Sequence, residues 1–283
     1  MILGGWRFRA FTDGLFRLDG GSMFGVVPRV MWEKQHPADE ANRIQLALRC
    51  LLAESAERRV LVDTGIGDRW DAKGQRIFAI ERQPGHLLGV LAAAGIDSGS
   101  ITDVVLTHLH FDHCGGAIRQ GDSGLRPAFP RARHWVQKQQ WDWANHPTER
   151  DRASFRPEDF RPLQDADLLQ LVDGAQEVIP GVRVTPIGGH TPGQQMVEFH
   201  TSGGVVVFCG DLIPFASQVH VPWIMGFDLN PLLTLNEKKQ FLSRAAEDNY
   251  VLVFEHDPVV EAGTVTFADG KFQLAESFTL GER

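Results

Sequence analysis

The chain has 283 residues, of which 43% are hydrophobic and 23% charged, a composition that predicts one globular domain with a sizeable core. A net charge of −8 without a basic stripe argues against a nucleic-acid partner, and we find no signal peptide and no apolar run near the roughly 20 residues of a membrane span. Three widely spaced cysteines are typical of a reducing compartment, so we expect a cytoplasmic protein with neither a disulfide framework nor a membrane partner.

Residues 1–45 are predicted to form an N-terminal extension, rich in glycine and aromatic residues, that precedes the first strand. Within it, residues 20–29 read GGSMFGVVPR and are predicted to form a loop that lines a pocket. The extension is compatible with packing on its own domain and with packing on a second subunit. The sequence therefore does not decide whether the chain forms a homodimer.

The next elements alternate between strand and helix. Residues 46–52 and 60–63 predict two strands, and the second runs into a turn at residues 63–65, where glycine suits unusual backbone angles. Residues 85–94 predict a helix because their apolar residues recur at helical spacing. Residues 101–107 then predict a buried strand.

The most informative motif follows this strand, where residues 107–116 read T-H-L-H-F-D-H-C-G-G. They place His108, His110, Asp112 and His113 within six residues, although the whole chain has only 11 histidines. Imidazole nitrogen and carboxylate oxygen are the donors that Zn²⁺ and its neighbours in the transition series bind. The cluster therefore predicts a metal site in preference to a solvated polar turn.

Residues 117–175 differ in character, because tryptophans and phenylalanines are interleaved with charged residues and prolines. They predict a helix at residues 136–145 followed by irregular chain. The segment is either an insert that covers the pocket or a surface excursion pinned by its aromatic residues, and the sequence favours neither.

The strand pattern resumes towards the C-terminus, at residues 182–187, 195–200, 205–208 and 250–254. Three of these strands are each followed by a further candidate ligand, namely His190, Asp211 and His256. A rigid sheet can bring such side chains to one site although they are far apart in the sequence.

From about residue 45 to 260 the chain resembles the metallo-β-lactamase-fold hydrolase superfamily. The resemblance rests on H-x-H-x-D-H at residues 108–113, followed in order by the three later ligands and preceded by Asp63 in an Asp-Thr-Gly turn. It implies an α/β (α+β) architecture, a four-layer αβ/βα sandwich of two mixed β-sheets flanked by helices. We expect residues 1–283 to form a single domain of this kind.

The resemblance also implies a site for two divalent metal ions. The first ion would be held by His108, His110 and His190, the second by Asp112, His113 and His256, and Asp211 would bridge both. Zinc suits these imidazole and carboxylate donors, and manganese, iron or cobalt also fit. Two such ions lower the pKa of a water molecule between them towards neutrality, which supplies a nucleophile.

Two aspartates carry further hypotheses. Asp112 is expected to take part in catalysis, by steering the proton of the hydroxide and assisting the leaving group as a general acid. Asp63 either accepts a hydrogen bond from a ligand imidazole or caps its turn.

Departures from better-known branches narrow the substrate. Acyl-homoserine lactonases of this superfamily carry a tyrosine three residues after the bridging aspartate, where this chain has Pro214. Glyoxalase II enzymes usually carry a second histidine shortly after the Gly-His-Thr motif, where this chain has Gln194 and Gln195. The chain most resembles the lactonase-like and organophosphate-hydrolase-like branch.

The N-terminal loop and the segment after Asp211 predict an apolar pocket wall with one polar group. Its members are Met23, Phe24, Trp32, His220, Trp223, Met225 and Phe227. For Met225 and Phe227, packing between the sheets is the favoured alternative, whereas His220 is the best candidate for a substrate or ligand-supporting contact.

The sequence thus predicts a dinuclear metal-dependent hydrolase that attacks a small, neutral to apolar carboxylic ester or lactone with a metal-bridging hydroxide. A phosphotriester (organophosphate) hydrolase is the first alternative, because the ligand set does not discriminate between carbon and phosphorus. A non-catalytic metal-binding sensor module is the second, and the complete set of ligand positions disfavours it.

Overall fold

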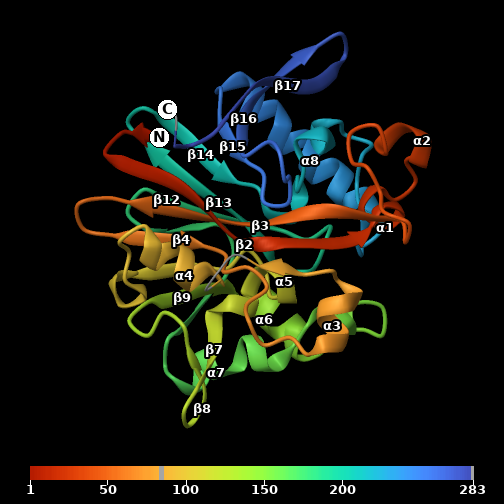
Figure 1. The fold of residues 1–283 in the computed structure, drawn as a ribbon. Coiled ribbons are helices and arrows are strands. Elements are labelled where there is room, and N and C mark those ends of the chain that lie inside the picture. Colours follow the sequence, from red (N-terminus) through yellow and green to blue (C-terminus); the bar gives the residue numbers. More distant parts are fainter. Residues whose placement is uncertain (83–85, 282–283) are drawn as a thin grey trace.

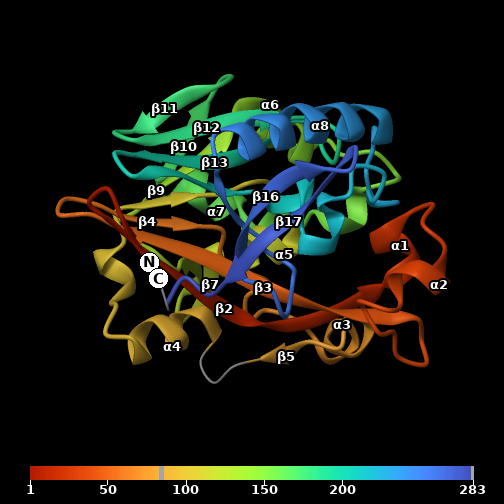
Figure 2. The ribbon, with the colours of Figure 1, turned by 90° about the horizontal axis from the view of Figure 1, so that it is seen from above.

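The computed structural model describes residues 1–82 and 86–281. Two large β-sheets lie face to face, and helices cover the outer face of each, so that the layers run helix, sheet, sheet, helix (Figure 1). The predicted four-layer sandwich is therefore confirmed. The two ends of the chain lie beside each other at one edge of the sandwich (Figures 1 and 2).

The first sheet joins an antiparallel half to a parallel half. Strands β2 and β3 form a long antiparallel pair, with Ala10 opposite Leu51, whereas β4, β6, β9 and β10 run parallel. Figure 2 shows this pair crossing the whole molecule. The strands in hydrogen-bonded order are β1 (Ile2–Leu3), β2 (Trp6–Asp19), β3 (Arg43–Glu54), β4 (Arg59–Val62), β6 (Asp103–Val105), β9 (Arg133–Gln137) and β10 (Leu169–Val172), with β5 (Glu81–Arg82) paired to β2.

The second sheet is mostly antiparallel, and its strands β14 and β15 pair in parallel. Its strands in hydrogen-bonded order are β11 (Gln176–Ile179), β12 (Val182–Ile187), β13 (Gln194–Thr201), β14 (Gly204–Phe208), β15 (Val251–Val253), β16 (Ala262–Ala268) and β17 (Lys271–Phe278). A separate hairpin consists of β7 (Ile118–Gly121) and β8 (Gly124–Pro127).

The main apolar core lies between the two sheets. Leu51 and Ala53 of β3 point into it and meet Val197 and Phe199 of the second sheet, whereas Cys50 of the same strand points to the helices outside. Successive side chains of a strand point to opposite faces, so a continuous apolar run in β3 serves two cores at once. This double burial fixes how the sheets and helices stack.

Helices complete the layers. Helices α4 and α6 cover the first sheet through Leu91 and Trp141, and α8 covers the second through Phe241 and Leu242. Among the described residues, no helix is both long and apolar enough to cross a membrane. The helices are α1 (Gly20–Phe24), α2 (Arg29–Trp32), α3 (Ala72–Ile77), α4 (His86–Ala93), α5 (Phe111–Cys114), α6 (Lys138–Asn145), α7 (Arg161–Asp165) and α8 (Pro231–Glu247).

The N-terminal extension departs from the sequence-based expectation. It contributes β1 and β2 to the first sheet instead of preceding it, and a register shift between Thr12 and Leu15 interrupts the alternation of β2. Residues 20–29, predicted to form a loop, begin with helix α1 and reach the first residue of α2. The interrupted alternation explains why β2 was not predicted.

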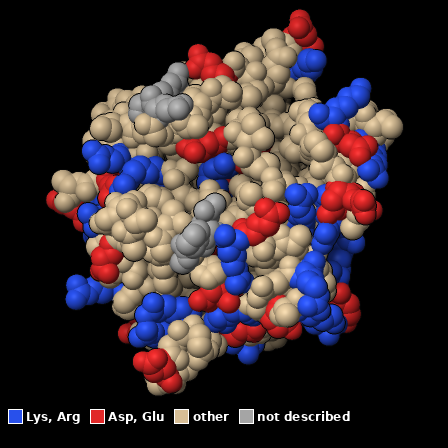
Figure 3. Space-filling view, viewed as in Figure 1, with Lys and Arg blue, Asp and Glu red and all other residues tan. Residues whose placement is uncertain are grey.

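Two other segments differ as well. Residues 117–175 contain β9 and β10, which are strands of the first sheet, and the predicted helix at 136–145 begins only at Lys138. The predicted helix at 85–94 is observed from His86, while Gly85 lies outside the described residues. On the face shown in Figure 3, basic and acidic side chains lie interspersed.

Candidate metal centre

The candidate ligands meet at one edge of the sandwich, because each follows a strand. After β6 the chain passes through His108 and His110 into α5, which carries Asp112 and His113. Because β14 and β15 are parallel neighbours, the chain leaves both at the same edge of the second sheet. The ligand candidates that follow strands of the second sheet are His190 after β12, Asp211 after β14 and His256 after β15.

The turn after β4 holds this cluster in place. Gly65 has a φ of +70°, and a Cβ at this position would lie 2.5 Å from Cβ of Asp13, so glycine is required here. Thr64 donates both its backbone N–H (2.8 Å) and its hydroxyl (3.0 Å) to the carbonyl of His113. The turn therefore fixes the end of α5 against the first sheet.

One group of donors consists of His108, His110, His190 and Asp211, all buried. His110 Nδ1 lies 2.9 Å from His108 Nε2 and 3.2 Å from His190 Nε2. Asp211 Oδ2 lies 3.2 Å from His190 Nε2. The sequence predicted these four residues as ligands of one ion, and the structure brings them together.

A second group forms around His113 and His256, whose Nε2 atoms lie 3.3 Å apart. Asp211 Oδ1 is 3.2 Å from His256 Nε2 and 3.6 Å from His113 Nε2, so its two oxygens face different groups. Asp112 Oδ2 lies further out, at 3.7 and 3.9 Å from the same two nitrogens. The tight group contains Glu255, which lies on the Nδ1 side of His113, and does not contain Asp112.

The outer nitrogens of the rings are already engaged, which fixes what the inner nitrogens can do. His256 Nδ1 donates to the carbonyl of Ala47 (2.8 Å), and His190 Nδ1 donates to Asp228 Oδ1 (3.0 Å). In the neutral rings each Nε2 therefore presents a lone pair to the cluster.

The ring of His113 has the same orientation: its Nδ1 faces the carboxyl groups of Asp63 and Glu255, and its Nε2 faces the cluster. Lone pairs of His113 and His256 that face each other beside a carboxylate repel unless a cation lies between them. Imidazoles oriented through their second nitrogen by a carboxylate or carbonyl are typical of metal sites. The donor set therefore fits two divalent metal ions.

Burial and neighbouring charges lower the pKa of some groups of the cluster and raise that of others. Burial and the neighbouring imidazoles hold the pKa of His108 and of His110 well below its usual value. Burial also opposes protonation of His256, but Asp211 outweighs it and raises this pKa to about 9. Although burial opposes its ionisation, the surrounding imidazoles hold the pKa of Asp211 well below its usual value. Protons and metal ions thus compete for the same nitrogens.

Asp63 supports the cluster instead of capping a turn alone. Its Oδ1 accepts from the backbone N–H of Thr107 (2.7 Å), and its Oδ2 accepts from the Thr107 hydroxyl (2.6 Å) and lies 3.1 Å from His113 Nδ1. Of the two roles left open by the sequence, the contact with a ligand imidazole is the one observed.

Glu255 was missed by sequence reasoning. Its Oε1 lies 3.0 Å from His113 Nδ1, its side chain is fully buried, and burial raises its pKa to about 8. Two features of the sequence point to Glu255. It directly precedes His256, and it follows a buried strand, where an acidic side chain needs a partner.

Gln140 is a second residue that the sequence did not single out. From α6 its Oε1 accepts from the backbone N–H of Leu109 (3.2 Å), and its Nε2 donates to the carbonyl of Pro192 (2.7 Å) and to the Thr191 hydroxyl (3.3 Å). This buried side chain therefore joins the loop of His110 to the loop of His190.

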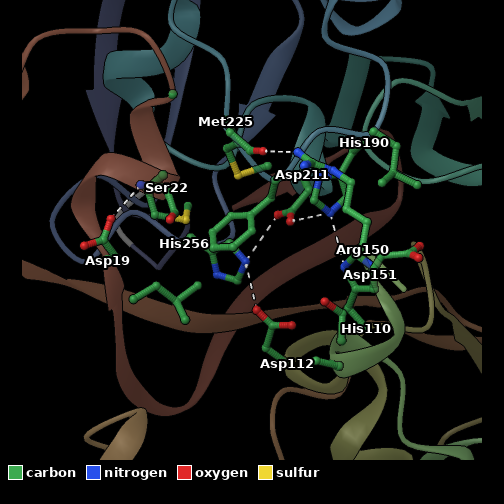
Figure 4. A pocket seen from close by; sticks show the side chains of 18 of the residues that line it. Asp19, Ser22, His110, Asp112, Arg150, Asp151, His190, Asp211, Met225 and His256 are labelled. Carbon is green, nitrogen blue, oxygen red and sulfur yellow. Dashed lines mark hydrogen bonds and ion pairs between the residues drawn. The ribbon is translucent and has the colours of Figure 1, made fainter. Parts of the chain in front are cut away.

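The two donor groups face one cavity of about 810 Å³ (Figure 4). Asp112, Asp211 and His256 line it together with His110 and His190. Most of the remaining wall is apolar and comprises Leu18, Met23, Val26, Phe78, Phe111, Met225, Phe227 and Leu229. From the segment at 117–175, Arg150, Asp151 and Ser154 contribute polar groups, which the sequence did not assign.

The predicted pocket wall is only partly observed. Met23 lines the cavity, and so do Met225 and Phe227, for which packing was the favoured alternative. Phe24 instead stacks on Trp32 within an adjoining core, with ring centroids 5.5 Å apart. Trp223 packs against that core as well and does not line the cavity.

His220 lies elsewhere, in a second hollow of about 660 Å³ beside His36 and Asp257. Lys238 of α8 donates to the carbonyls of His220 (3.1 Å) and Trp223 (2.6 Å), which holds this loop against that helix. His220 is not among the described residues that line the cavity at the metal centre, so its substrate contact stays a prediction.

The sequence profile of the Metallo-beta-lactamase superfamily matches residues 48–256, most of the chain. The chain therefore belongs to this superfamily, and by class it is a metal-dependent hydrolase, as the sequence predicted.

Several known proteins are similar to it. The N-acyl homoserine lactonase AiiA of Bacillus thuringiensis subsp. kurstaki is 26% identical over 235 residues, which cover 76% of this chain and 82% of that protein. The crystal structure of a probable metal-dependent hydrolase from Staphylococcus aureus has a TM-score of 0.90 and 27% identity, and covers 99% of this chain and 98% of its own. AidC, a dizinc quorum-quenching lactonase, shares the fold with a TM-score of 0.82 at 22% identity, over 99% and 97% of the two chains.

Proposed function

We propose that this protein hydrolyses a small carboxylic ester or lactone at a dinuclear metal site. One observation carries the proposal: two groups of imidazole nitrogens share the carboxylate of Asp211 and face a single, largely apolar cavity. His108, His110 and His190 would hold one ion, His113 and His256 the other, and Asp211 both. Zinc is the first choice, since imidazole and carboxylate are its usual nitrogen and oxygen ligands. When bound, such ions lower the pKa of a water molecule and polarise a carbonyl.

Asp112 has the best position for moving a proton. It lines the cavity, and its Oδ2 lies 3.7 Å from His256 Nε2, beside both donor groups and open to a substrate. A carboxylate in this place can take a proton from the nucleophile and return it to the leaving oxygen. Asp63, Asp228 and the carbonyl of Ala47 serve a different purpose, because they orient ligand rings from behind.

The walls of the cavity favour a substrate with a hydrocarbon part. Apolar side chains such as Met23 and Phe227 exclude water from the reacting bond and bind an acyl chain through burial of apolar surface. The lactonase relatives suggest a lactone. The tyrosine of that branch is replaced by Pro214, whose carbonyl accepts the backbone N–H of His256 (3.0 Å), so no phenol assists the substrate carbonyl from this position.

The test combines metal analysis with a substrate panel. We expect about two divalent ions per chain after loading, and turnover of p-nitrophenyl esters and N-acyl homoserine lactones that is lost in His108→Ala and His256→Ala. His146→Ala is the matched control, because His146 is exposed and lies outside the cavity. Turnover of paraoxon-like triesters alone would favour the phosphotriesterase, and a fully loaded protein without any turnover would favour the sensor.

A further inference from the structure

One wall of the cavity carries an arginine that the proposed reaction leaves without a role. Arg150 follows α6 along the chain and lines the cavity that His110 and His190 face. Its Nη2 donates to the carbonyl of Gly226 at 2.7 Å, a bond that reaches across to the segment of Met225 (Figure 4). Of the described residues that line this cavity, Arg150 is the one lysine or arginine.

None of the acidic side chains that line this cavity forms an ion pair with Arg150. Asp19 accepts from the Ser22 N–H (2.8 Å) with Oδ1 and from the Asn42 side chain (2.8 Å) with Oδ2. Both of its oxygens are therefore already engaged in holding the start of α1.

Asp151 is engaged as well. Its Oδ2 accepts from Trp143 Nε1 (2.7 Å), and its Oδ1 accepts from the backbone N–H (3.0 Å) and hydroxyl (2.6 Å) of Thr148. Asp112 and Asp211, the other acids of the cavity, lie within the metal centre. Among the described residues, Arg150 therefore has no acidic partner, and its guanidinium donates to the carbonyl of Gly226.

A guanidinium group in this state is suited to bind an anion. It carries five N–H donors in a planar fork, and it pairs with a carboxylate through two parallel hydrogen bonds. Met225 and Leu229 line the same cavity, and their apolar side chains give an anion no partner but accommodate a methylene chain.

We propose that Arg150 forms a subsite for an anionic group, such as a carboxylate, at the end of the substrate that is distant from the scissile bond. The proposal rests on the proposed function and adds a substrate class to it: esters or lactones whose acyl chain ends in a negative charge. The apolar wall binds the chain, the metal centre binds the reacting carbonyl, and Arg150 binds the far end.

The subsite can be tested without turnover. Calorimetry on the metal-loaded protein would compare monocarboxylates of four to ten carbons with dicarboxylates of the same lengths. Each pair offers the metal centre one carboxylate, and only the dicarboxylate offers a second to Arg150. We expect at least one dicarboxylate to bind about tenfold more tightly than its partner, and Arg150→Gln and Arg150→Met to remove this preference while leaving monocarboxylate binding unchanged.

Arg152→Gln is the matched control, because Arg152 lies in the same segment, is exposed and does not line the cavity. It should keep the preference. An equal loss for both ligand series in Arg150→Gln would overturn the subsite, since it would show that Arg150 only ties its segment to Gly226. Equal binding of both series by the wild-type protein would overturn it as well. If the preference is found but no ester or lactone is hydrolysed, the proposed function fails and the subsite stands.

Discussion

The side chain of Gln140 accepts a hydrogen bond from the backbone N–H of Leu109, and the same amide donates to the loop of His190. One helix outside the first sheet thereby sets the spacing between two ligand loops that are 82 residues apart, from His108 to His190. We expect Gln140→Met, which keeps the volume and removes the hydrogen bonds, to weaken metal binding by about tenfold or more, as supporting residues of metal sites commonly do. Competition with a chromogenic chelator measures this. Gln139→Met on the exposed face of the same helix is the control, and equal affinities of the two variants would contradict the role of Gln140.

Asp63 and Glu255 both contact His113 Nδ1, but we expect them to differ in effect. Asp63→Ala removes the acceptor that also holds Thr107, so metal affinity should fall by about 10- to 100-fold. Burial raises the pKa of Glu255, so a neutral amide in its place costs little, and it keeps a polar group beside His113. Glu255→Gln should therefore bind metal nearly as well as the wild type at pH 7. A larger loss in Glu255→Gln than in Asp63→Ala would reverse this assignment.

Asp112→Asn separates metal binding from proton transfer. The asparagine keeps the shape of the side chain but cannot accept or return a proton, so kcat should fall by about 10²- to 10⁴-fold with the metal content retained. Metal analysis and steady-state kinetics on the same preparation give both quantities. A variant with both ions and full turnover would show that Asp112 has no catalytic role.

Phe227 and His220 distinguish the cavity from the second hollow. Phe227→Ala should raise KM for esters of long acyl chains by about fivefold, which corresponds to roughly 1 kcal/mol of lost apolar contact, and should leave acetyl esters unaffected. His220→Ala should change neither, because His220 lies outside the cavity. A selective effect of His220→Ala on KM would restore it as a substrate contact.

His134 should limit stability in mild acid. Burial lowers its pKa to about 4, although the backbone carbonyl of Ala132 accepts from its Nδ1. The unfolded chain takes up a proton near pH 6.5 and the folded chain does not, so the stability of the fold decreases as the pH falls from about 6.5 towards 4. This single group accounts for about 2 kcal/mol between pH 7 and pH 5.

His134→Leu should remove that part of the pH dependence, whereas the exposed His146→Leu should not. Urea titrations of wild type and both variants at pH 7 and pH 5 provide the comparison. The same pH dependence in all three proteins would show that His134 is not responsible.

The parts of the site that sequence analysis anticipated share one property: each group of ligand candidates lies within a few residues of the end of an apolar run. Val104 and Val105 precede the histidine cluster, and Val253 precedes His256 by three residues, so strand prediction places these ligands at one edge. The four-layer fold follows from the resemblance together with this alternation.

The residues that sequence analysis missed act through contacts between distant segments. Gln140 bonds to partners 31 and 52 residues away, and Glu255 contacts His113 across the interface of the two sheets. His220 follows Asp211 closely in the sequence but lines the second hollow, where buried Lys238 donates a hydrogen bond to its carbonyl. Apart from the position of Glu255 beside His256, no local sequence pattern indicates these contacts.

The ligands of the centre come from both halves of the sandwich, His108 and His113 from the first sheet and His190, Asp211 and His256 from the second. A bound ion would thus cross-link the two sheets in a chain whose three cysteines are all unpaired. The melting temperature should accordingly follow the concentration of free metal, with a gain of about 2.7 kcal/mol when the ion is present at 100 times its Kd. In a cell, starvation for metal would then both silence this protein and expose it to proteolysis.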